Sequence, residues 1–206
     1  MKLKSLVVGP VGTNCYIMSN DTKDCVIVDP GDEAGRILDY IKSEDLHVSA
    51  ILLTHGHFDH ITAVNELREA LGCLVYAGSD EEKMLNDPAL NSCGFGMGAP
   101  IVVKDVTYLS DGEMVYPAGF SIKTLFTPGH TPGGVCYYVE KDGILFSGDT
   151  LFCMSVGRTD FPGGSSSALI RSIKEKLLPL PDDTKVYTGH GESTDIGFEK
   201  THNYFL

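Results

Sequence analysis

The residues best suited to chemistry lie in one short run, Thr-His-Gly-His-Phe-Asp-His at positions 54–60. This run places three imidazoles and one carboxylate, from His55, His57, Asp59 and His60, within six positions. Imidazole and carboxylate groups are common protein ligands of zinc and other first-row transition metals. A chain rarely crowds these groups so tightly unless something is bound between them, so the run predicts a metal site.

Three further candidate ligands stand beside glycine, each after an apolar run: His130, Asp149 and His190. Glycine permits tight turns and the close approach of another backbone. Five of the seven histidines fall in these four turns, and the other two, His47 and His202, are interpreted as structural or solvent-exposed. If the preceding strands reach one sheet edge, the four turns converge on one site.

The donor set predicts two divalent metal ions. Five imidazoles and two carboxylates exceed what one tetrahedral ion needs. A set without thiolate favours zinc, with iron or manganese as alternatives. One ligand must then be shared, and a carboxylate bridges two cations whereas an imidazole normally does not. Asp149 is therefore the expected bridge.

Short apolar runs alternate with amphipathic segments, which predicts the elements that position these turns. Strands are expected at 3–8, 14–19, 25–29, 48–53, 73–77, 113–116, 119–126, 134–140, 143–147 and 185–188. Helices are expected at 33–43, 61–71, 79–86, 165–178 and 195–204. The segment 87–100, rich in Asn, Pro and Gly, is interpreted either as a lid or as a plain surface connection. The order predicts one α/β domain over residues 1–206, with two sheets and helices outside them, as a four-layer sandwich.

Composition narrows the partners and the compartment. A net charge of −12 without a basic cluster argues against nucleic-acid binding. Neither a membrane span nor a signal peptide is expected, because no apolar run is long enough. Four cysteines in strand-like contexts predict buried thiols and a reducing, cytoplasmic location: Cys15, Cys25, Cys73 and Cys136. The expected partner is a small-molecule substrate, and no oligomeric state is predicted.

The seven candidate ligands, in their order along the chain, resemble the metallo-β-lactamase fold superfamily over residues 13–191. The resemblance implies an αβ/βα sandwich. It also implies a first site of His55, His57 and His130, a second site of Asp59, His60 and His190, and a bridging Asp149. Asp29, in a Val-Asp-Pro-Gly-Asp turn, resembles a supporting aspartate of the family, and a plain turn residue is the alternative.

Four stretches, at 12–16, 127–133, 148–152 and 189–191, are similar to the glyoxalase II branch of the family. That similarity implies a thioesterase that cleaves S-acyl glutathione thioesters such as S-lactoylglutathione. A metal-bound hydroxide would attack the carbonyl, with Asp59 and Asp149 as the catalytic carboxylates. The chain stops at Leu206, without most of the C-terminal glutathione-binding domain of the full-length enzymes, and resembles a compact bacterial glyoxalase II-like subgroup. Another thioester is therefore an open alternative.

The loop 155–161 is expected to select the substrate. Arg158 takes the family's basic position and would bind a substrate carboxylate, whereas Asp160 replaces an aromatic residue and would either act there or simply pair with Arg158. Residues 157–160 also resemble persulfide dioxygenases, which hold one iron. That dioxygenase is the alternative function, and a non-catalytic metal-binding module is a third. β-Lactamase activity is not expected without a secretion signal.

Overall fold

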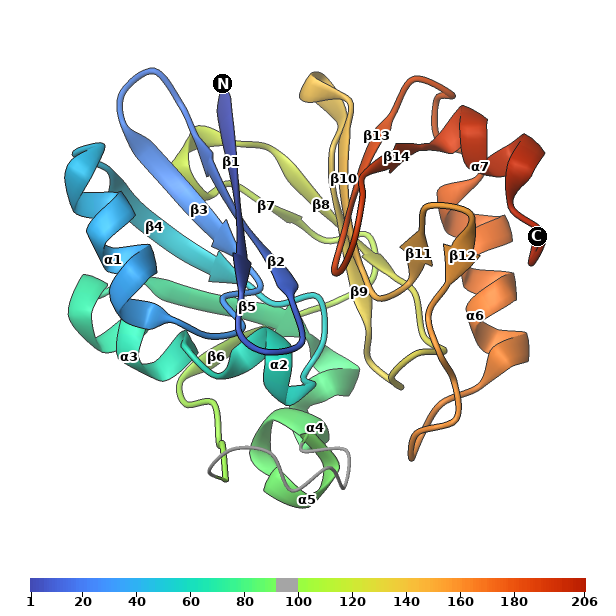
Figure 1. Ribbon diagram of the computed structural model, residues 1–206, viewed down its shortest axis with the longest axis horizontal. Helices are drawn as coiled ribbons and strands as arrows, with labels where there is room; N and C mark the ends of the chain where they lie inside the picture. The colour runs from blue at the N-terminus through green and yellow to red at the C-terminus, as the bar shows by residue number, and fades with distance from the viewer. Residues whose placement is uncertain (92–99) are drawn as a thin grey trace.

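The computed structural model describes residues 1–91 and 100–206. Within these ranges, two six-stranded mixed sheets stand face to face (Figure 1). The first sheet has the spatial order β1 (Lys2–Val8), β2 (Thr13–Ser19), β3 (Asp24–Val28), β4 (His47–Leu52), β5 (Leu74–Gly78), β6 (Val106–Leu109). The second has the order β14 (Thr194–Asp195), β13 (Lys185–Thr188), β10 (Ile144–Gly148), β9 (Val135–Val139), β8 (Ile122–Phe126), β7 (Met114–Val115). A small hairpin joins β11 (Leu151–Phe152) to β12 (Ser155–Val156).

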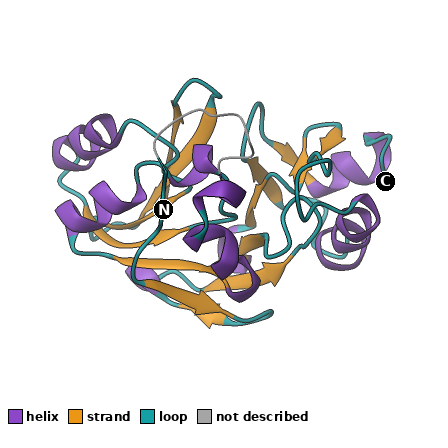
Figure 2. Cartoon of the chain, turned by 90° about the horizontal axis from the view of Figure 1, so that it is seen from below, coloured by secondary structure: helices purple, strands orange, loops and turns teal. Residues whose placement is uncertain are grey.

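Helices cover the outer faces of both sheets (Figures 1 and 2). The first half contains α1 (Ala34–Ser43), α2 (Phe58–Ile61), α3 (Val64–Leu71), α4 (Glu82–Asn86) and α5 (Pro88–Asn91). The second half contains α6 (Ser166–Ser172), which continues into a π-helical turn at Ile173–Leu177, and α7 (Ile196–His202). Single 3₁₀ turns occupy Ser79–Glu81, Pro117–Gly119 and Glu140–Asp142.

Three apolar layers hold this arrangement together. Successive strand residues point to opposite faces, so β2 sends Ile17 toward α1 and α3 and sends Met18 toward the second sheet. Tyr137 and Phe146 fill the layer between the sheets from the other side. A third layer lies between the second sheet and the last helices, and it includes Leu169 and Ile173 from α6 and the π-helical turn. The layers are helix, sheet, sheet and helix, which confirms the predicted four-layer sandwich.

Strand direction brings the predicted turns together. In the first sheet β3, β4 and β5 run parallel, so the segments after β3 and β4 leave from one edge. In the second sheet β8, β10 and β13 share one direction. The two edges meet where the Asn14 N–H donates to the Gly189 carbonyl at 2.8 Å, next to a bridge between Thr13 and His190. Five strand ends therefore open into one place.

Several predicted boundaries were wrong. The strand expected at 119–126 begins only at Ile122, because residues 117–119 form a tight turn with Ala118 at φ 54°. The helix expected at 61–71 is two helices, and α2 begins earlier, at Phe58. The sequence analysis missed the short strands β6, β11, β12 and β14. Helix α5 lies in the segment 87–100, for which a lid and a plain surface connection were the two interpretations, and residues 92–99 of that segment lie outside the described ranges.

Two other expectations are confirmed. All four cysteines predicted to be buried are buried, and His47 and His202 are exposed. Among the helices formed by residues 1–91 and 100–206, none has the length and apolar character needed to cross a membrane.

Candidate metal centre

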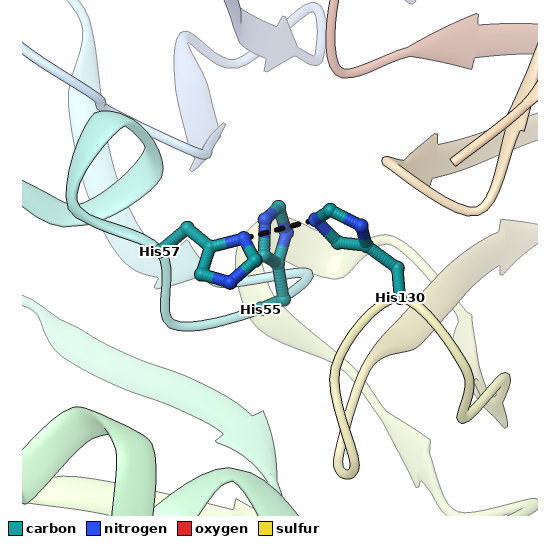
Figure 3. Close-up of side chains that lie close together, drawn as sticks. All are labelled: His55, His57 and His130. Atoms are coloured by element: carbon teal, nitrogen blue, oxygen red, sulfur yellow. Dashed lines mark hydrogen bonds between the residues drawn. The ribbon is translucent and has the colours of Figure 1, made fainter. Parts of the chain in front are cut away.

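The structure gathers all seven predicted ligand side chains at the meeting point of the two sheets. His55, His57 and His130 form a first group, and Asp59, His60 and His190 form a second group. Within each group the candidate ligand atoms lie within 4.8 Å of one another. Figure 3 shows the first group, in which His55 and His57 come from the loop after β4 and His130 reaches them from the facing turn. Both groups therefore combine residues from the two halves of the chain.

Asp149, at the end of β10, lies between the two groups. Its Oδ1 is 3.4 Å from His60 Nε2, and its Oδ2 is 3.6 Å from both His130 Nε2 and His190 Nε2. Position 189 in the neighbouring turn must be glycine, because a Cβ there would lie 2.1 Å from Asp149 Oδ1. This position suits a shared ligand, the role predicted for Asp149.

Some polar atoms of the cluster have no hydrogen-bond partner within the protein, which suits the binding of cations. Buried polar atoms normally have hydrogen-bond partners, yet within the described residues His55 Nε2 and Asp149 Oδ1 are buried without one. His57 Nδ1 lies 2.9 Å from His130 Nε2, and His60 Nε2 lies 3.3 Å from His190 Nε2. Ring nitrogens that converge in this way supply lone pairs to a common point, so the cluster is able to bind metal ions.

Two histidines of the first group have lowered pKa values, which favours the form that binds a cation. Burial, together with the neighbouring imidazoles, holds the pKa of His55 well below its usual value. Burial and the proximity of His130 lower the pKa of His57 to about 3. His55 and His57 are therefore neutral at physiological pH, and the neutral imidazole is the form that binds a metal.

In the second group, two histidines have raised pKa values. Burial opposes a charge on His60, but Asp149 and Asp29 outweigh it and hold the pKa of His60 well above its usual value. Burial also opposes a charge on His190, but its hydrogen bond to Asp59 and the nearby Asp149 charge together outweigh burial and raise the pKa of His190. The raised pKa values favour the protonated form of these two imidazoles, and a bound cation would displace that proton.

Asp29 orients the second group from behind. Its Oδ1 accepts the Thr54 N–H at 2.8 Å, and its Oδ2 accepts the Thr54 hydroxyl at 2.6 Å and the His60 Nδ1–H at 2.9 Å. With Nδ1 occupied, His60 presents Nε2 to the centre. These contacts favour the supporting interpretation of Asp29 over the plain turn residue.

The sequence analysis missed two contributors to the site. Thr54 contacts Asp29 and also lies 3.1 Å from His55 Nδ1, and its position directly before the first histidine was an available signal. Glu81 is 1% exposed, and its carboxylate contacts the backbone on both sides of the centre. Nothing in the acidic stretch 80–82 distinguishes it from a solvated helix start.

A cavity of about 570 Å³ opens over the cluster, a volume typical of small-molecule sites. Its floor includes His57, Asp59, His130, Asp149 and His190. The remaining lining residues are Val11, Phe58, Phe152, Arg158 and Phe161, and we call these five the mouth. The mouth is apolar except for one guanidinium.

Within the mouth, Arg158 makes three kinds of contact: an ion pair, a contact with an aromatic ring and a backbone hydrogen bond. Its Nε and one terminal nitrogen donate to the two Asp160 carboxylate oxygens, both at 2.7 Å. The guanidinium carbon lies 3.9 Å from the centre of the Phe161 ring, and that ring meets His57 edge-on at 5.6 Å. The Arg158 backbone carbonyl accepts from His130 Nδ1 at 2.7 Å. The ion pair with Arg158 that was weighed for Asp160 is present, and Arg158 lines the cavity.

Comparison with known proteins identifies the class. The family model of the metallo-beta-lactamase superfamily matches residues 8–190. The chain belongs to this superfamily, as the resemblance of the ligand turns implied.

Two curated relatives match over the whole chain. The probable metallo-hydrolase YqgX of Bacillus subtilis is 44% identical, covering 100% of this chain and 98% of its own. The hydroxyacylglutathione hydrolase GloC of Haemophilus influenzae is 37% identical, with the same coverage of 100% and 98%. The coarse function follows from these matches: the chain is a metal-dependent hydrolase of the superfamily.

Two solved structures share the fold closely. The B3 metallo-beta-lactamase BLEG-1 superposes with a TM-score of 0.95 at 44% identity, covering 100% of this chain and 99% of its own. TTHA1623 in a di-iron-bound form superposes with a TM-score of 0.89 at 38% identity, covering 98% of this chain and 100% of its own. A similar chain therefore holds two metal ions, and in that structure they are iron.

Proposed function

We propose that this protein is a thioesterase that hydrolyses small-molecule S-acyl thioesters of the S-lactoylglutathione type. The observation that carries the proposal is a seven-donor cluster at the floor of a cavity whose mouth is apolar with one cation. The similarity to the relative described as a hydroxyacylglutathione hydrolase supports the same chemistry. In the proposed site the first group would hold one divalent cation, the second group would hold another, and Asp149 would contribute a ligand to both. Zinc is the proposed metal, with iron as the alternative.

The chain's own residues would organise the reaction. Bound cations supply a water of lowered pKa and positive charge for the developing oxyanion. Asp59 Oδ2 is held by the Thr13 hydroxyl at 3.2 Å and by His190 Nε2 at 3.1 Å. From the cavity floor, that oxygen can orient the attacking water and take its proton. Asp149 faces the same space from the second half of the chain.

The leaving group fits what the cavity offers. Apart from the candidate metal ligands, the described residues that line it include no His, Asp, Glu, Lys, Cys or Tyr that could serve as a general acid. A thiolate departs without protonation, whereas an amine or an alkoxide needs a proton donor. This difference favours a thioester over an amide or an unactivated ester.

The residues of the mouth support a particular class of substrate. Phe58, Phe152 and Val11 offer apolar contact to the acyl or thiol chain. Arg158 offers a fixed positive charge, and guanidinium binds carboxylate in a planar, bidentate geometry. We therefore propose a thioester that carries a carboxylate.

The decisive assay uses purified protein with its metals intact. We expect close to two metal ions per chain, measured by mass spectrometry, and thiol release from S-lactoylglutathione without oxygen, measured with a thiol reagent. A His57→Ala variant is the matched control, because it removes one donor of the first group.

Other functions of the same fold give different outcomes in this assay. One iron per chain, with oxygen uptake on glutathione persulfide and negligible thiol release, would replace the proposal with a persulfide dioxygenase. Cleavage of a chromogenic cephalosporin without thioester cleavage would replace it with a β-lactamase, the class of the neighbour BLEG-1. Metal binding with none of these activities would leave a non-catalytic module.

A further inference from the structure

Glu81 is a buried acidic residue whose contacts join the two halves of the metal centre. It ends the 3₁₀ turn that follows β5 and is 1% exposed. Its Oε1 accepts the Gly56 N–H at 2.8 Å, between His55 and His57 in the loop of the first sheet. Its Oε2 reaches the facing loop, which belongs to the second sheet. One carboxylate therefore spans the seam between the halves.

The second oxygen contacts the turn that carries His130. Oε2 accepts the Thr131 hydroxyl at 3.0 Å and the Gly133 N–H at 2.9 Å. The backbones also touch, since a Cβ on Gly133 would lie 2.1 Å from the Glu81 nitrogen. The three donors come only from the loops that carry the first group.

Keeping a carboxyl group in this position is costly for folding. Burial raises the pKa of Glu81 to about 7 although the three hydrogen bonds oppose the shift. Within the described residues Glu81 forms no ion pair with Lys or Arg. A buried charge without a counter-charge destabilises a fold. The hydrogen-bond partners of Glu81 therefore indicate its role.

We infer that Glu81 is a positioning residue that sets the separation of His55 and His57 from His130, and so tunes the first metal position and not the second. This inference rests on the proposed metal centre. Glu81 contacts both parts of the first group, whereas the second group, which also spans the two sheets, is held by other contacts: Asp29 supports His60, and the Asn14 N–H donates to the Gly189 carbonyl beside His190. Residues that orient metal ligands typically change metal affinity by about 10- to 100-fold when they are replaced.

The test measures zinc affinity by chelator competition in single-site proteins. His190→Ala leaves the first group intact, and His57→Ala leaves the second. Adding Glu81→Gln to the His190→Ala protein should weaken zinc binding by about tenfold or more. Whichever way the new amide is turned, at least one backbone N–H loses its acceptor. Adding it to the His57→Ala protein should change zinc affinity less than about twofold, since Glu81 contacts neither α2 nor the His190 turn.

Glu199→Gln is the matched control. Glu199 is also fully buried, but it accepts from Met154 N–H, the Thr194 hydroxyl and the Asn203 amide, none of which lies in a turn carrying a ligand. It should lower the melting temperature and leave zinc affinity unchanged in both backgrounds. The d–d spectrum of bound cobalt should change with Glu81→Gln and not with Glu199→Gln.

Two results separate this inference from the proposed function. A wild-type protein that binds no metal overturns both. A wild-type protein with two metals, together with Glu81→Gln proteins of unchanged zinc affinity and lowered melting temperature, overturns only the role of Glu81. If Glu81→Gln does not fold, Thr131→Val removes one of the three donors, and unchanged affinity there overturns the role equally.

Discussion

The floor and the mouth of the cavity are built on opposite principles. At the floor, His57 is 4% exposed and His130 is 5% exposed, and the ligand candidates His55 and His60 behind them are each held by a further residue. At the mouth, the Val11 residue is 44% exposed and the Arg158 side chain 52% exposed. The mouth side chains lie on turns and short elements that the core does not constrain. We therefore expect the fold to fix the chemistry and the exposed loops to select the substrate.

The strongest test of the floor is Asp149→Ala. Its carboxylate faces imidazoles of both groups, so we expect the variant to lose most of both metals and to lose thioester hydrolysis by about 10³-fold or more. Metal content and thiol release are measured on the same preparation.

Asp160→Ala is the control for Asp149→Ala, because it removes a carboxylate at the rim of the cavity whose ion pair is with Arg158 and not with the ligand cluster. That variant should keep both metals. Full metal content with normal activity in Asp149→Ala would remove the shared-ligand role and, with it, the idea that the floor works as one unit.

Arg158→Ala should affect the mouth alone. For a carboxylate-bearing thioester we expect KM to rise about tenfold, the value of one charge-assisted hydrogen bond, with kcat within about twofold. The metal content should stay constant, because His130 is held by the backbone carbonyl of residue 158 and the substitution leaves that carbonyl in place. Steady-state kinetics with a neutral thioester of similar size serve as the comparison. A fall in kcat together with metal content would show that floor and mouth are not separable.

The floor could be predicted from the sequence, and the mouth largely could not. Histidine and aspartate are few, and their spacing after apolar runs is visible, so the turns at 54–60, 130, 149 and 190 were identified. The sandwich followed because strand and helix periodicities differ. The predicted domain extent and the metal assignments stay predictions.

What the sequence hid depends on three-dimensional packing. Val11, Phe58 and Phe152 resemble any other apolar residues along the chain, and only the folded cavity brings them together. Glu81 looks like part of a solvated acidic stretch until the two sheets close over it. The hairpin β11–β12 has strands of two residues, too short for a periodic signal.

The smallest expected effect concerns the charge balance of the mouth. Asp160 neutralises Arg158, so Asp160→Asn should lower KM for a carboxylate-bearing thioester by about threefold, as expected for an exposed ion pair.

The hydrogen bond from Arg158 lowers the pKa of Asp160 to about 2, below its ordinary 3.8. A depressed pKa keeps the pair intact above the ordinary value, and the pair is lost only as the pH falls through about 2. The ratio of wild-type to Asp160→Asn KM should therefore be constant between pH 5 and pH 9, while kcat follows the titration of the floor. A ratio that drifts within this range would mean that the mouth titrates as well, and the separation between a titrating floor and a permanently charged mouth would fail.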